Sequence, residues 1–150
     1  TKGMKRWKIL VSKLLMMAVF WTVGCLITFG ITYGYNTYFW DNDIVQNLLF
    51  AVSGYYLVGL WLISVVLLAS VALKSSSGVT LFVGAAFIVS YLLGFLPAFR
   101  EYVPTFILSS NELLVEAIHR KECFAAVGIT LSLTIINGCL SVHYFNKKTI

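Results

Sequence analysis

Charged residues are scarce in this sequence, and their scarcity excludes several classes of protein. Only 11% of the 150 residues are charged, whereas 59% are hydrophobic. A water-soluble domain carries more charge than this on its surface, and a disordered chain has far fewer apolar residues. The three cysteines form no CxxC pair, so neither a disulfide scaffold nor a zinc cluster is indicated. Apolar runs of about twenty residues need lipid as their solvent.

Four such runs predict an all-α, polytopic membrane protein with a single transmembrane domain. We place its spans at about residues 9–33, 47–73, 79–96 and 123–145. At 1.5 Å per residue, about 20 residues cover the roughly 30 Å of hydrocarbon in a bilayer. The turn KSSSG at residues 74–78 is short, so the second and third spans should form an antiparallel hairpin. Its serine hydroxyls can cap the start of the third span.

A short amphipathic helix is predicted at the outer interface before the fourth span, at about residues 110–121. Ser109 stands three residues before Glu112, which is the spacing of a capping box. Glu116 and Arg120 pair at i,i+4 on one face, while leucine, alanine and isoleucine share another. Such a helix suits a membrane interface, where it would cover the outer ends of the spans.

Basic residues gather on one side of this topology. Eight lysines and arginines lie on the side that holds both termini and the serine turn, against three in the other two loops. The positive-inside rule therefore places both termini in the cytoplasm, and we expect a multi-pass protein of a bacterial plasma membrane. The net charge of +5 is a topology signal and gives no reason to expect a nucleic-acid partner. The basic start also suits anionic membrane lipids.

Chemistry-bearing motifs are missing from the 150 residues. The sequence has no phosphate-binding GxxxxGK[ST] loop, no HExxH and no GxSxG, and the interior of no span holds an Asp, Glu or Arg. We therefore expect no catalytic residue, no cofactor and no metal site, and we disfavour a self-contained proton antiporter. His119 and Cys123 have the i,i+4 spacing of one helix face, but a metal site needs three or four converging ligands.

Two features of the spans indicate helix–helix packing. Asn137 is the most polar group well inside a span, so it should hydrogen-bond to another helix; a contact with substrate is the less favoured interpretation. Small residues also recur four apart, among them Gly30 with Gly34 and Gly128 with Ser132. Such ridges allow close approach within a bundle or at a dimer face.

The order of parts resembles a known family. The string RWKILVSKLL at residues 6–15 looks like the start of the third membrane helix of type-2 ABC transporter permeases. Four later parts, in their order, are similar to that family's last four helices. They are an aromatic and acidic outer loop at 35–43, a serine turn at 73–78, an outer segment leading into LSSN at 108–111 and the ending FNKK at 145–148. The first two of the family's six spans, and most or all of its coupling element, have no counterpart here. We therefore expect a portion of a six-span permease.

The resemblance implies a membrane subunit of an exporter that forms the substrate path with a second permease copy, identical or different. A separate cytoplasmic ABC ATPase would hydrolyse the ATP, so this chain would not itself be an enzyme. By analogy, the residues nearest that ATPase would be Lys2, Lys5, Arg6, Trp7, Lys8, Lys74, Ser75, Ser76 and Ser77. The helix after Ser109 would lie above the exit of the path.

Two other functions remain open. A four-helix membrane scaffold or assembly protein without transport activity would have the same hydropathy and charge asymmetry. A small ion channel is less favoured, because the spans carry no charged or amide rings.

Overall fold

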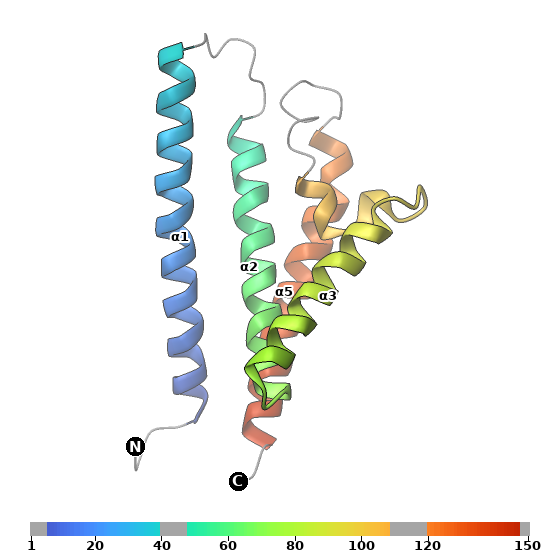
Figure 1. Ribbon diagram of the computed structural model, residues 1–150. Helices are drawn as coiled ribbons and strands as arrows, with labels where there is room; N and C mark the ends of the chain where they lie inside the picture. The colour runs from blue at the N-terminus through green and yellow to red at the C-terminus, as the bar shows by residue number, and fades with distance from the viewer. Residues whose placement is uncertain (1–5, 40–47, 109–119, 148–150) are drawn as a thin grey trace.

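The computed structural model describes residues 6–39, 48–108 and 120–147 (Figure 1). It has four long helices, α1 (Arg6–Phe39), α2 (Leu48–Ala72), α3 (Ser76–Leu93) and α5 (Arg120–Lys147), and two short 3-10 helices, η2 (Arg100–Tyr102) and η3 (Pro104–Leu108). Across these three ranges all the regular structure is helical. The prediction of an all-α chain is confirmed, and the four long helices are long and apolar enough to cross a membrane.

The long helices run alternately up and down (Figure 1). The start of α1, the α2–α3 turn and the last residue of α5 lie together at one end of the bundle, which we call the terminal end. Residues 94–108, which follow α3, and the start of α5 lie at the opposite end, which we call the loop end. The turn leaves only three residues between α2 and α3, so these helices form the predicted antiparallel hairpin.

The helix bounds depart from the predicted spans at α1. This helix continues to Phe39, six residues beyond the predicted span, because nothing in its sequence breaks it and its polar groups are satisfied locally. The Thr37 hydroxyl donates to the Tyr33 carbonyl at 2.8 Å, and the rings of Tyr35 and Phe39 lie 4.5 Å apart, one helical turn from each other. At 34 residues α1 is about 50 Å long, so it extends beyond the hydrocarbon core.

The third long helix lies three residues earlier than its predicted span, at 76–93 instead of 79–96. Ser75 holds the N-cap position, but its hydroxyl makes no capping hydrogen bond. At the other end the backbone switches to turns of i→i−3 bonds, with Phe95 N–H donating to the Leu92 carbonyl at 3.1 Å. Pro97 lacks an N–H and restricts the residue before it, which explains why the helix does not continue.

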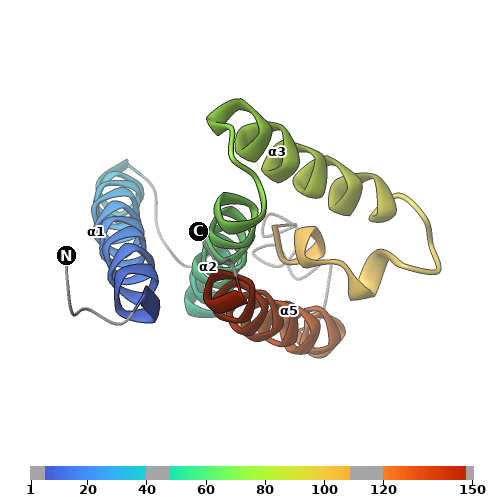
Figure 2. The ribbon, with the colours of Figure 1, turned by 90° about the horizontal axis from the view of Figure 1, so that it is seen from below.

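Helix α2 forms the centre of the molecule. Ten of its residues are buried, and it contacts each of the other three long helices as well as η3. Seen along the bundle, α1 lies on one side of α2, while α3 and α5 diverge on the other (Figure 2). In contrast, Ser90 is the only buried residue of α3. The outer surfaces of α1, α3 and α5 therefore meet the membrane or a partner.

The segment at residues 103–107, which we call the wedge, folds back into the bundle at the loop end. Its five residues are buried between α2, α3 and α5. Ile107 lies against Gly54 of α2, where a Cβ would collide with its side chain, so the glycine permits the close approach. The Thr105 hydroxyl donates to the Ser90 carbonyl of α3 at 3.0 Å. The wedge thereby joins three helices at the loop end.

Helix α1 is attached to α2 at two places. Near its middle the Trp21 ring lies against Gly59, and the indole N–H donates to the Tyr56 carbonyl at 3.3 Å. The Thr22 hydroxyl and the Tyr56 hydroxyl lie 2.9 Å apart. Near the terminal end Leu10 of α1 packs with two buried residues of α2 in a small separate core. Val142 and Phe145 of α5 pack against the same small core, so α1 also contacts α5 near the terminal end.

Candidate functional site

Four of the six described basic side chains lie at the terminal end, and the other two, Arg100 and Lys121, lie at the loop end. Lys8, Lys13, Lys74 and Lys147 lie on the parts of α1, the α2–α3 turn and α5 that point toward this end (Figure 1). Glu101 lies at the loop end, in η2, beside Arg100. The Arg100 guanidinium stands over the Phe106 ring, 5.6 Å from its centre, in the geometry of a cation–π contact. The two ends of the bundle therefore differ in charge.

Some of the residues predicted to lie nearest an ATPase partner are found at this terminal end. Trp7 and Lys8 open α1, and Lys74 and the three serines after it form the α2–α3 turn and the start of α3. All of them are exposed. Lys2, Lys5 and the side chain of Arg6 lie outside the described residues. The described members come from two separate places on one face of the bundle, so one broad partner surface would be needed to reach both.

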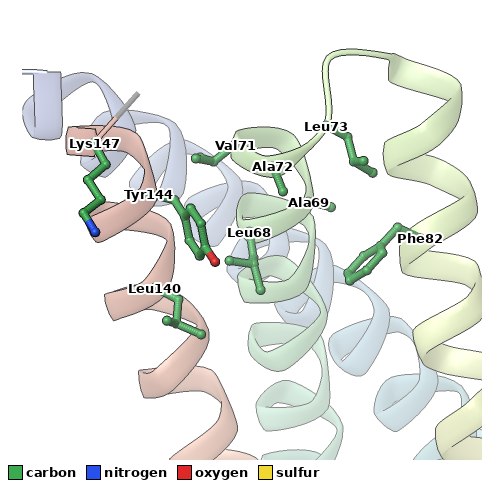
Figure 3. Close-up of a pocket in the computed structure, with 9 residues that line it drawn as sticks. All are labelled: Leu68, Ala69, Val71, Ala72, Leu73, Phe82, Leu140, Tyr144 and Lys147. Carbon is green, nitrogen blue, oxygen red and sulfur yellow. The ribbon is translucent and has the colours of Figure 1, made fainter. Parts of the chain in front are cut away.

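A groove of about 640 Å³ also opens at the terminal end, and the sequence did not reveal it. Helix α2 forms its floor, while α3 and α5 form its walls (Figure 3). Apart from Tyr144 and Lys147, which stands at the edge, its lining residues are apolar. The groove is lined by Leu68, Ala69, Val71, Ala72, Leu73, Phe82, Leu140, Tyr144 and Lys147. Such a volume lies within the roughly 300–1,000 Å³ typical of small-molecule sites.

The sequence indicates one wall of this groove but not the other. Leu140, Tyr144 and Lys147 follow the i, i+4, i+7 spacing of one helix face, which marks a stripe on α5. The opposite wall depends on the direction of α3, which is tilted relative to the other helices (Figure 1). Nothing in a single apolar run fixes the tilt of a helix, because tilt depends on what the helix packs against.

The interior polar groups are engaged with one another. Asn137 of α5 donates from Nδ2 to the Ser64 hydroxyl of α2 at 3.3 Å, and Ser64 donates in turn to the Trp61 carbonyl at 2.6 Å. Asn137 thus forms an interhelical contact of the type the sequence predicts. The buried Thr130 hydroxyl bonds to its own helix, at the Ala126 carbonyl. Over the described ranges no buried side-chain nitrogen or oxygen lacks a hydrogen-bond partner. The bundle interior therefore offers no unsatisfied polar group to a ligand.

The small-residue ridges were expected to serve either a packed bundle or a dimer face, and they differ from one another in the structure. Ser90 is buried and accepts a hydrogen bond from Thr105, whereas several of the ridge glycines face open space. A Cβ added at Gly30, Gly34, Gly128 or Gly138 would meet no atom within 4 Å, so these glycines bring no two helices of the chain together. The close approaches occur instead at Gly54 and Gly59, as described above. These four glycines thus lie on surface that the described residues leave open, where a second protein or lipid can lie.

The remaining predicted positions fall at the edge of the described structure. Ser109, Glu112, Glu116 and His119 lie outside it, as does the side chain of Arg120, so the amphipathic helix has no counterpart to compare. Cys123 is fully buried in the core cluster that contains Ile107 and Ala126. Among the described side chains no three His, Cys, Asp or Glu residues converge on a common point.

Comparison of the chain with known protein families, with curated proteins and with solved structures gives no match. Function must therefore be argued from the geometry and from the sequence. The described part has the architecture of a multi-pass membrane protein, with four apolar helices, a basic terminal end and an apolar groove opening at that end.

Proposed function

We propose that this chain is a membrane-spanning permease subunit of an ATP-driven transporter of the type-2 ABC class, acting as an exporter. A separate cytoplasmic ATPase supplies the ATP hydrolysis, and a second permease copy, identical or different, completes the substrate path. The proposal rests on the resemblance in the order of sequence parts. Four long helices with a serine turn between the second and third agree with the last four helices of such a permease.

The observation that carries the proposal is the difference between the two ends of the bundle. The terminal end is basic and exposes Trp7, Lys8, Lys74 and the serine turn, whereas the wedge fills the loop end. By the positive-inside rule the terminal end is cytoplasmic. A partner that hydrolyses ATP would then find an exposed, charged surface on the side where ATP is present.

The open surfaces of the helices support a second membrane partner. On the half of α1 nearer the loop end, Ile27 and Ile31 are exposed, and no described atom lies near a Cβ built at Gly30. On α5 the side chains of Leu131 and Ile135 are exposed in the same way. Lipid alone could cover these faces, but glycine on an exposed apolar face is also what close packing with another helix requires.

The topology is tested first. In a protein whose three native cysteines are replaced by alanine, a single cysteine is introduced at Ser76 or at Glu101. Each variant is labelled with an impermeant maleimide, first in intact cells and then after permeabilisation. We expect Glu101→Cys to react in intact cells and Ser76→Cys only after permeabilisation. The reverse pattern would place the basic terminal end outside and would remove the basis for a cytoplasmic ATPase partner.

Co-purification tests the function itself. The full-length protein, extracted in mild detergent, is expected to bring down a nucleotide-binding subunit whose ATP hydrolysis changes when the two are together. Lys74→Glu with Lys8→Glu should weaken the association, while Leu92→Ala, at an exposed position of α3, should leave it unchanged. A stable complex without any ATPase would favour the scaffold, a function also consistent with an interior whose described polar groups are all satisfied. Conductance from the chain alone in planar bilayers would instead indicate a channel.

A further inference from the structure

The groove at the terminal end is apolar space that none of the described residues fills. Leu73, Phe82, Leu140 and Tyr144 line it, and all four are exposed, with 47% of Phe82 and 55% of Tyr144 accessible. At the loop end the wedge occupies the corresponding space between α2, α3 and α5. The groove therefore lies over α2, with α5 on one side and α3 on the other (Figure 3). An acyl chain would enter it between these two helices.

The dimensions of the groove favour a flexible chain over a protein helix. Its α5 wall runs from Leu140 to Lys147, which is about 11 Å along the helix axis. A transmembrane helix of a second copy would make contacts over most of the roughly 30 Å of hydrocarbon. An acyl chain needs only a short apolar trough and can bend into it from the surrounding leaflet.

Charge identifies the kind of headgroup. Lys147 lies at the edge of the groove in the last turn of α5, and Lys74 directly follows the lining residue Leu73. Glu101, in contrast, lies at the loop end of the bundle. A lysine ammonium is a point charge that suits phosphate, and basic side chains at the membrane surface attract anionic lipids. The mouth of the groove therefore matches a lipid whose headgroup carries a net negative charge.

We propose that the groove binds an anionic phospholipid of the leaflet at the terminal end, with one acyl chain between α3 and α5 and its phosphate at the Lys147 ammonium. Lys74 supplies a second positive charge near the mouth. The lipid would fill at the terminal end the space that the wedge fills at the loop end, so that α3 is supported along its length. This inference is independent of whether the chain serves a transporter.

Native mass spectrometry of the full-length protein released from bilayers tests the proposal. The bilayers contain equal amounts of phosphatidylglycerol and phosphatidylcholine with identical acyl chains. We expect one retained lipid per chain, with phosphatidylglycerol preferred about fivefold, the factor that one lysine at an anionic surface provides. Lys147→Gln should abolish this preference, while Lys8→Gln, which removes an exposed lysine from the same end outside the groove, should keep it.

A second pair of variants tests the apolar part. Ala72 lines the groove and is exposed, so Ala72→Phe should fill the space and remove the retained lipid whatever its headgroup. Ala125→Phe adds the same ring at an exposed position of α5 away from the groove and should leave retention unchanged. Thermal unfolding shows whether each variant is folded. If Ala72→Phe does not fold, Lys147→Gln alone tests the proposal.

Three results would overturn the proposal. Equal retention of the two lipids by the unmodified protein would show that the groove does not select an anionic headgroup. An equal loss of the phosphatidylglycerol preference in Lys147→Gln and Lys8→Gln would show that the preference comes from general attraction by a basic surface. Loss of a dimer, instead of a lipid, in Ala72→Phe would assign the groove to a second copy of the chain.

Discussion

The two halves of the space between α3 and α5 are built differently. At the loop end, the wedge brings Phe106 and Ile107 into a core with α2 and α5, and these side chains are buried. At the terminal end, Leu67 and Val71 of α2 pack with Leu10 of α1. Val71 also lines the groove, along which Phe82 and Leu140 remain exposed. One pair of helices thus has a protein-filled half and an open half. Stability should reside in the first and ligand binding in the second.

Truncating one phenylalanine in each half gives the largest expected effect. Phe106 is 5% exposed, so Phe106→Ala should lower the free energy of unfolding by about 3 kcal/mol, the lower end of the range for a buried aromatic. We choose the lower end because lipid is itself apolar, which leaves lost packing as the main cost. Phe82→Ala, at the groove, should cost less than about 1 kcal/mol. Unfolding in mixed micelles measures both, and equal costs would erase the distinction between the halves.

The same contrast between filled and open space separates two glycines of the α1–α2 pair. Gly59→Ala would place a methyl group where the Trp21 ring lies, and overpacking of this kind costs about 1–3 kcal/mol. Gly30→Ala meets no atom and should instead stabilise the helix by about 0.4–1 kcal/mol, since the unfolded chain loses freedom. Opposite signs in thermal unfolding are the expected result. A stabilised Gly59→Ala protein would mean that Trp21 does not pack on α2.

The smallest effect is expected at the polar contact between α2 and α5. Asn137→Ala and Ser64→Ala, combined in a double-mutant cycle, should show a coupling energy of about 0.6 kcal/mol, the average for interhelical hydrogen bonds in membranes. Thr134→Ala serves as the control, because its hydroxyl bonds within α5 to the Thr130 carbonyl at 2.7 Å and should not couple to Ser64. Additive losses from Asn137 and Ser64 would show that the 3.3 Å contact contributes no energy.

Much of the fold could be predicted because it depends on composition along the chain. Uncharged runs bounded by lysines and loop residues located all four long helices, since a span must satisfy its backbone internally and present apolar side chains to lipid. The short serine turn predicted the α2–α3 hairpin. Asn137 was singled out because an unpaired amide in an apolar run is costly, and the structure places it against Ser64.

The wedge and the groove could not be predicted, because both depend on how separate elements meet. The apolar stretch VPTFIL at 103–108 was the only available sign of the wedge, yet the same residues could equally lie at the membrane surface. Whether they turn inward depends on the absence of a side chain at Gly54 and on the divergence of α3 and α5. The glycines singled out at four-residue spacing had the right chemistry for close approach, but at Gly30, Gly34, Gly128 and Gly138 no described atom lies where a Cβ would stand.

The 18 residues of α3 have a consequence for the membrane around it. At 1.5 Å per residue the helix is about 27 Å long, and its lean reduces the thickness it can cover still further (Figure 1). Phe95 and Phe99, both exposed just beyond its end, are suited to anchor it at the headgroup level. Beside α3 the bilayer therefore has to thin, so lipids with shorter acyl chains should gather there, and this flank of the protein should respond to bilayer thickness more strongly than the flank formed by α1.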